Sequence, residues 1–291
     1  MATRHITQDG ARATLAAVAI AKNEAGNISG LIANLEPLVD QIVIVDDCST
    51  DGTADIANRP GGRVTVVTRA MELGEGFAGQ RNVGIAAATA DWLIHMDADE
   101  RLTPELAAEM RAAISSTDLN GFRYRRLNHF LQRPMRHGGW TSWNRPQLAR
   151  RGRHRFEGRV HETCVIDGGD AATGQLDGIM LHLNEATFEE RLSKSAKYVE
   201  MTANDYSGSA DFGGGRIFAR TVIAFLKRYV VQRGFLDGTP GLISALHSAT
   251  AEFRALALVW DRRTRVSRGD FEERLATEWG LRGCTGKRSA P

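Results

Sequence analysis

The first hundred residues alternate short apolar runs with helix-like segments, and this alternation restricts the fold more than any other feature. Apolar runs of strand length lie at residues 14–20, 42–45, 64–67 and 92–96. After the first run, Ile28, Leu31, Ile32 and Leu35 recur at helical spacing. Such alternation predicts a mainly parallel sheet with helices on both faces. We therefore expect an α/β nucleotide-binding domain.

Two of these runs end in acidic residues. Asp46 and Asp47 follow the second run, and Asp97 and Asp99 follow the fourth. Ligands of an open parallel sheet bind beyond the carboxyl ends of its strands, so both acidic ends are expected to converge on one site. An isolated Asp-x-Asp on a surface loop is more often a solvated turn or a helix cap. After a buried strand, it indicates a divalent metal that holds a diphosphate.

Composition and cysteine usage exclude several classes of protein. Lys and Arg total 37 against 35 Asp and Glu, a net charge of +2, so no global field marks a nucleic-acid-binding protein. Cys48, Cys164 and Cys284 are far apart and lack Cys-x-x-Cys spacing, which argues against a disulfide framework or a zinc site. Residues 1–12 lack the apolar core of a signal peptide. We expect a cytoplasmic protein.

A glycine-rich stretch at residues 74–79 precedes Arg81 and Asn82. It lacks the Gly-x-x-x-x-Gly-Lys-Ser/Thr pattern, so a Walker-type NTPase is not expected. We interpret the stretch as a connector that leads into an Ala-rich helix ending at Ala88. Arg81 is the functional candidate there, because a guanidinium binds a diphosphate bidentately.

Ordered motifs at residues 19–24, 45–53, 80–84 and 91–100 make the chain resemble glycosyltransferase family 2. The resemblance implies an inverting enzyme with the GT-A fold, a mixed α/β sheet. It implies that Asp46 and Asp47 hold the base and ribose of a nucleotide sugar, while Asp97 and Asp99 organise Mn²⁺ or Mg²⁺ on its diphosphate. Cys48 stands where members more usually have Gly. The implied donor-binding residues are Ala21, Asn23, Glu24, Asp46, Asp47, Ser49, Arg81, Asn82, Asp97 and Ala98.

Motifs at residues 145–152, 156–162 and 234–241 resemble bacterial transferases that add a sugar, often glucose, to the lipopolysaccharide inner core. This implies UDP-glucose as donor and a lipid-linked glycan as acceptor, although Gln147 and Ala149 depart from the Arg and aromatic residue usual there. Because the family places its base late in the GT-A domain, Glu162 is our candidate general base. A structural strand-end pair is the alternative for His161 and Glu162. Candidates for acceptor or diphosphate contacts are Arg159, His161 and Trp140.

The last third of the chain predicts amphipathic helices. The pair Thr187 and Glu190 forms a capping box. Further on, Phe218, Val222, Phe225, Leu226 and Tyr229 share one helical side, opposite Arg216, Arg220 and Lys227. A second stripe runs from Leu242 to Trp260, and neither helix has the run of roughly 18 apolar residues that spanning requires. These helices are expected either to bind an anionic membrane surface or to pack on the core or on a partner.

We therefore expect a disordered N-terminus at residues 1–13, a GT-A catalytic domain at 14–185, a helical extension at 186–280 and a disordered tail at 281–291. The expected location is peripheral, on the cytoplasmic face of the inner membrane. Alternatives are a transferase acting on polyprenyl phosphate and a non-catalytic nucleotide-sugar-binding protein at the membrane surface. A sugar-1-phosphate nucleotidyltransferase is disfavoured, because residues 21–26 provide no glycine-rich phosphate loop after the first strand.

Overall fold

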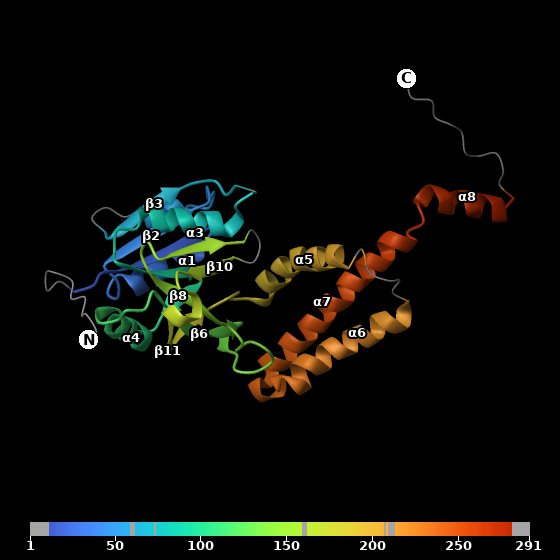
Figure 1. Ribbon diagram of the computed structural model, residues 1–291. Helices are drawn as coiled ribbons and strands as arrows, with labels where there is room; N and C mark the ends of the chain where they lie inside the picture. The colour runs from blue at the N-terminus through green and yellow to red at the C-terminus, as the bar shows by residue number, and fades with distance from the viewer. Residues whose placement is uncertain are drawn as a thin grey trace, which may run out of the picture.

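The computed structural model describes residues 12–58, 62–72, 74–158, 162–206, 208 and 213–280. The tail expected at residues 281–291 lies outside them, as does the expected disordered N-terminus apart from Arg12 and Ala13. Figure 1 shows an α/β domain on one side and a group of long helices on the other. The elements of the first half are β1 (Leu15–Ala21), α1 (Ala25–Leu35), β2 (Gln41–Asp46), α2 (Thr53–Ala57), β3 (Val64–Thr68), α3 (Gly76–Ala87), β4 (Trp92–Asp97), β5 (Glu100–Leu102) and α4 (Pro104–Ser115).

The central sheet confirms the predicted α/β class. Its strand order is β3-β2-β1-β4-β8-β6-β11-β5, and the first four strands are parallel. The later strands in this order are β6 (Gly121–Phe130), β8 (Asn144–Arg150) and β11 (Thr173–His182). Strand β8 then pairs antiparallel with β4 and β6, which makes the sheet mixed. Since β1 lies between β2 and β4, the strand ends at Ala21, Asp46 and Asp97 lie at one edge of the sheet.

Both faces of the sheet are covered. This agrees with the sequence of β1, which is apolar throughout, because its successive side chains point to opposite faces of the sheet. Leu15, Ala17 and Ala19 pack into the cluster that contains apolar residues of α1 and α4. Ala16 and Val18 point to the other face, where they meet α3. Every residue of β1 from Leu15 to Ala19 is fully buried.

The glycine-rich stretch is helical from Gly76 onward, so the prediction of a connector over residues 74–79 is wrong beyond Glu75. Close packing of α3 on the sheet explains the glycine at position 84. A Cβ there would lie 2.3 Å from Val18 Cγ1 and 3.2 Å from Val45 Cγ2. Gly84 therefore lets α3 approach β1 and β2 closely, which sets the position of Arg81 on the same helix.

The second half of the α/β domain completes the sheet. Strands β6 and β11 run parallel to each other, and β9 and β10 form a separate hairpin-like pair. The elements are β6 (Gly121–Phe130), β7 (Arg133–Pro134), β8 (Asn144–Arg150), β9 (His154–Glu157), β10 (Thr163–Ile166), the 3₁₀ helix η1 (Gly169–Ala172) and β11 (Thr173–His182).

Most of the described residues from Phe188 onward are helical. The helices are α5 (Phe188–Asp205), α6 (Gly214–Leu226), the π-helical η2 (Lys227–Val231), the 3₁₀ helix η3 (Gly234–Asp237), α7 (Gly238–Thr264) and α8 (Arg268–Glu278). The predicted capping pair opens α5: Thr187 Oγ1 accepts from the Glu190 amide, and Glu190 Oε2 accepts from the amide of Ala186. Helices α5 and α6 lie on either side of α7 (Figure 1).

The predicted basic stripe of α6 does not form one exposed surface. Arg220 points to α7, where its Nε lies 2.9 Å from Glu252 Oε1. Phe225 and Tyr229 stack on each other at 5.2 Å, and the exposed apolar side has shifted toward Ile223 and Val230. Core packing does not account for this side of the helix, because Phe218 is 72% exposed.

A loop between β7 and β8 attaches the helices to the α/β domain. His137 donates its amide to Asp237 Oδ2 (2.8 Å), and its Nδ1 lies 2.9 Å from Asp237 Oδ1. The Trp140 indole donates to Ser244 Oγ at 3.1 Å.

The helix Gly234–Thr264 is long and apolar enough to span a membrane, with a mean hydropathy of 1.2. Core helices of soluble proteins also meet these two criteria.

Candidate active site

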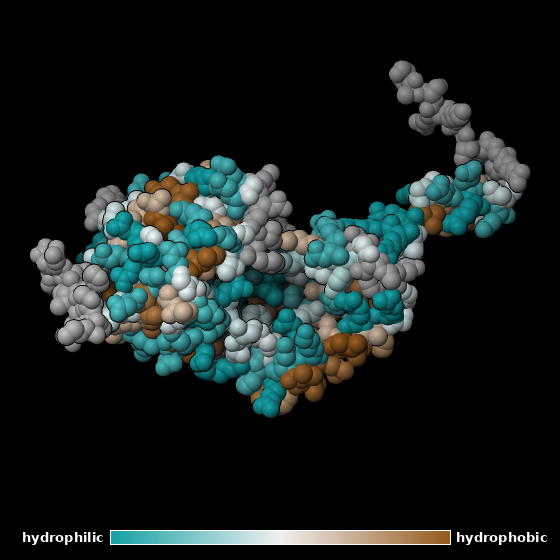
Figure 2. All heavy atoms as spheres, in the orientation of Figure 1, coloured by the Kyte–Doolittle hydropathy of each residue, from teal (hydrophilic) through white to brown (hydrophobic). Residues whose placement is uncertain are grey.

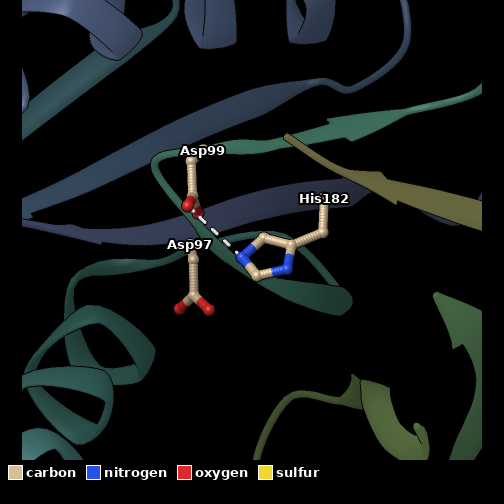
Figure 3. Close-up of side chains that lie close together, drawn as sticks. All are labelled: Asp97, Asp99 and His182. Atoms are coloured by element: carbon tan, nitrogen blue, oxygen red, sulfur yellow. Dashed lines mark ion pairs between the residues drawn. The ribbon is translucent and has the colours of Figure 1, made fainter. Parts of the chain in front are cut away.

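Two acidic side chains and one histidine converge at the edge where the strands end (Figure 3). Asp97 ends β4, Asp99 lies in the turn after it, and His182 ends β11. One ligand atom from each lies within 4.8 Å of the others. Two carboxylates and an imidazole form a donor set that suits Mn²⁺ and other divalent ions.

The hydrogen bonds of His182 identify which ring nitrogen is available. Its Nδ1 lies 2.7 Å from Asn128 Oδ1, and the Asn128 amide nitrogen donates to the Trp140 carbonyl at 2.5 Å. The Nδ1 therefore carries a proton, and in a neutral ring Nε2 presents its lone pair. This Nε2 lies 3.3 Å from Asp99 Oδ2. Two lone pairs at that distance require a proton or a cation nearby, so the cluster fits a bound metal.

In its protonated form, His182 also affects Asp99. Burial raises the pKa of the Asp99 carboxyl, but the hydrogen bond and positive charge of His182 outweigh that effect and lower the pKa below its ordinary value. A protonated imidazole, or a divalent ion in the place of that proton, would thus stabilise the ionised Asp99 carboxylate. His182 was not among the residues predicted from the sequence; its position after the apolar residues 179–181, at the end of β11, is the local signal.

The buried Arg81 joins the group of Asp97, Asp99 and His182, called the metal-type cluster below, to the candidate base Glu162. Its Nη2 lies 2.6 Å from Asp97 Oδ1, and its Nε lies 3.2 Å from Glu162 Oε1. Burial lowers the pKa of Arg81, but the negative charges of Asp97 and Glu162 raise it by more. The net pKa is therefore above the ordinary value, and the guanidinium stays charged. Arg81 therefore brings together two acids that lie 16 and 81 residues away from it along the chain.

A second arginine, Arg126, stabilises the turn that follows β4. Glu100 accepts from the Asp97 amide at 2.9 Å and from Arg126 Nη1 at 3.1 Å. The guanidinium of Arg126 lies over the Trp143 ring at 4.6 Å. Burial, followed by the charge of Asp97, raises the pKa of Glu100 to about 7. These contacts hold the backbone of Asp97 in place, and no local sequence pattern indicates Arg126.

The predicted donor-binding residues on β1 and β2 lie in two loops that bind each other. Ala21 is the register partner of Asp46, and the amide of Asn23 donates to Ser49 Oγ at 2.8 Å. Asp46 Oδ2 accepts from the Ser49 amide at 2.9 Å. Asp46 Oδ1 is buried without a hydrogen-bond partner among the described residues, so it is an acceptor whose hydrogen-bonding capacity is unused.

Asp47 and Cys48 shape the turn after β2. Asp47 Oδ1 accepts from the Met71 amide at 2.7 Å, and Lys22 forms an ion pair with the same carboxylate at 3.4 Å. Cys48 adopts a left-handed conformation with φ 49°. Glycine adopts this conformation without strain, which gives a physical reason for the glycine usual at this position. The Cys48 side chain is exposed.

Other predicted site residues have different surroundings. The amide group of Asn82 bonds the backbone of Phe156 in both directions, at 2.9 and 2.8 Å. Ala98 is buried inside the turn. Burial is the main cause of the raised pKa of Glu24, with Asp99 adding to it. Trp140 lies in the contact with α7 described above, and Arg159 and His161 lie outside the described residues.

Comparisons with known proteins identify the family of this chain. Residues 17–169 match the sequence profile of Glycosyl transferase family 2. The chain is 31% identical over 276 residues to the lipopolysaccharide core biosynthesis glycosyltransferase LpsC of Rhizobium meliloti, covering 90% of this chain and 97% of that protein. It is also 24% identical over 253 residues to an uncharacterized glycosyltransferase of Rickettsia prowazekii, covering 83% and 85%.

Among solved structures, S. aureus TarS 1–349 in complex with UDP-GlcNAc covers 88% of this chain and 93% of its own, with 16% identity and a TM-score of 0.46. The Pyrobaculum calidifontis mannosyltransferase in complex with GDP-Man and Mn²⁺ covers 96% and 84%, with 16% identity and a TM-score of 0.42. The profile match, and an identity that extends over nearly the whole chain, confirm the resemblance drawn from the motifs. The chain belongs to glycosyltransferase family 2 and has the GT-A fold of that family.

Proposed function

We propose that this glycosyltransferase is metal-dependent and inverting, and that it transfers a sugar, expected to be glucose from UDP-glucose, to a lipid-linked glycan such as the lipopolysaccharide core. The observation that carries the proposal is the pair of contacts made by Arg81. They place Glu162 beside the cluster of Asp97, Asp99 and His182. The relationship to LpsC supports the choice of acceptor class, and the cytoplasmic face of the inner membrane is the corresponding location.

The loops after β1 and β2 would bind the nucleoside. Asp46 Oδ1 offers a buried acceptor, and the bond between Asn23 and Ser49 holds the two loops together. A divalent ion held by Asp97, Asp99 and His182 would supply Lewis-acid stabilisation of the departing nucleoside diphosphate. Mn²⁺ is favoured over Mg²⁺ by the imidazole ligand.

Glu162 would remove the proton from the acceptor hydroxyl. Its side chain is 19% exposed, so an acceptor can reach it, and Arg81 fixes one of its oxygens. The same guanidinium contacts Asp97, so the positions of Glu162 and of the expected metal ligand Asp97 are fixed relative to each other. General-base catalysis of this kind contributes about 10²- to 10⁴-fold to a rate.

The test is the variant Glu162→Gln, with Glu157→Gln as matched control. Glu157 lies on β9 and pairs with Arg155 outside the cluster. Glu162→Gln should lower transfer by about 10²- to 10⁴-fold while donor affinity, measured by titration calorimetry, stays unchanged. Weak donor binding in Glu162→Gln, or normal transfer, contradicts the assignment.

The metal site has its own test. Asp99→Asn should remove the Mn²⁺-dependent part of donor binding, since it replaces a charged ligand with a neutral one. Unchanged affinity in that variant would exclude Asp99 as a ligand.

A further inference from the structure

A continuous apolar ridge covers the outer side of α6, η2 and η3. Its side chains are Phe218, Ile223, Leu226, Val230, Val231 and Leu236, each between 44% and 75% exposed. Figure 2 shows the hydrophobic atoms gathered along the edge of the helical extension where α6 lies. Soluble proteins rarely leave a large contiguous apolar patch uncovered, so such a patch indicates a binding partner.

Charge in the same segment indicates the chemistry of that partner. Residues 213–236 contain no Asp or Glu, whereas Arg216, Arg220, Lys227, Arg228 and Arg233 are all basic. Lys227 and Arg233 are exposed beside the ridge. An anionic lipid surface matches both properties, because it accepts apolar side chains and attracts cations. A symmetric second copy would place the same cations against each other.

The contacts of α7 favour a position on the bilayer surface over a position across it. Although Gly234–Thr264 has the composition of a span, its inner side makes polar and ionic contacts. Glu252 pairs with Arg220, and Arg254 donates to Ser195 at 2.7 Å. Charged groups are expensive inside a membrane, and here they hold α7 to α5 and α6.

A chain of side-chain contacts connects the ridge to the metal-type cluster. Asp237 at the end of η3 binds His137, and Trp140 in the same loop binds α7. Asn128 then donates to the Trp140 carbonyl and accepts from His182 Nδ1. The cluster is therefore held at a fixed place relative to the ridge.

We propose that this apolar ridge docks the enzyme on the surface of an anionic lipid bilayer, which positions its active site for a lipid-linked acceptor. The docking deepens the proposed function and rests on it only for the nature of the acceptor.

The experiment is cosedimentation of the full chain with vesicles of phosphatidylglycerol and phosphatidylcholine, or of phosphatidylcholine alone. The ridge variant is Phe218→Ser, Ile223→Ser and Val231→Ser combined. The matched control replaces three apolar residues of α5, Leu192, Tyr198 and Met201, by Ser; these are 43%, 65% and 51% exposed. Nucleoside diphosphate release with delipidated core oligosaccharide is measured in parallel.

The wild-type chain and the α5 control should bind the anionic vesicles, and bind less to phosphatidylcholine alone. The ridge variant should bind roughly 100-fold more weakly, at about fivefold for each partly buried side chain, with unchanged release from the soluble acceptor. Equal binding of the ridge variant, or no binding of the wild type, overturns the proposal. Retention after an alkaline carbonate wash also overturns it, in favour of a spanning α7. Vesicle binding without release overturns the proposed function alone.

Discussion

Replacing Arg81 by Met should destabilise the fold and at the same time strengthen the response to metal. The change leaves Asp97 and Glu162 without their shared cation, since Arg81 is 4% exposed and touches both. Breaking a buried ion pair by removing one partner costs about 3–5 kcal/mol. Because the Asp97 side chain is 38% exposed, solvent screening favours the lower end, about 3 kcal/mol. That corresponds to a fall in Tm of roughly 6–12 °C for a chain of this size.

The metal response follows from the same charges. Without the guanidinium, the carboxylates at the cluster repel one another, and a bound Mn²⁺ relieves that repulsion. Mn²⁺ should therefore raise the Tm of Arg81→Met by more than it raises that of the wild type. Differential scanning fluorimetry in chelator and in Mn²⁺ measures both effects.

Two controls separate this account from a general loss of packing. Arg81→Lys keeps the charge and should recover part of the stability. Arg69→Met removes a partly exposed arginine that pairs with the exposed Glu72 and Glu75, and it should have little effect. A Tm for Arg81→Met close to that of the wild type, or a smaller response to Mn²⁺ than the wild type shows, would contradict the role of Arg81 as the shared cation of Asp97 and Glu162.

Further predictions concern three other positions. His182→Ala should weaken Mn²⁺ binding by at least about tenfold, as measured by calorimetry, and an unchanged affinity would remove His182 from the site. Burial, followed by the charge of Arg191, lowers the pKa of His247 to about 4. In the unfolded state, His247 has a pKa of about 6.5 and takes up its proton at a higher pH than in the folded state. As the pH is lowered from 6.5 to 4, the free energy of unfolding therefore falls by up to about 1.4 kcal/mol per pH unit. Urea unfolding of His247→Gln should show a flatter pH dependence, and an identical profile would contradict this. Gly84→Ala should cost about 1–3 kcal/mol in the same assay because its Cβ meets Val18, and wild-type stability would contradict the close packing of α3.

The first half of the fold was predictable because its signals are local. Strand-length apolar runs and helical spacing lie within a few residues, and β1 to β4 begin or end within a residue or two of the predicted limits. Helix α3 is the exception. Its glycines at 76 and 79 are unfavourable for a helix, and packing against the sheet overrides that preference.

The second half depends on contacts between distant parts of the chain. His182 reaches Asp99 only because β11 pairs with both β6 and β5, and Glu162 contacts Arg81 from a position 81 residues further along the chain. No periodicity near either residue encodes these pairings. The orientation of α6 was missed for a similar reason, because Arg220 finds its partner Glu252 on another helix.

The most direct test of the central claim is nucleoside diphosphate release from UDP-glucose, with lipopolysaccharide as acceptor, in Mn²⁺ and in chelator. Release should require both the metal and the acceptor, and it should be lost in Asp99→Asn and in Glu162→Gln. Release that persists in chelator and in Asp99→Asn would contradict a metal-dependent site at Asp97, Asp99 and His182.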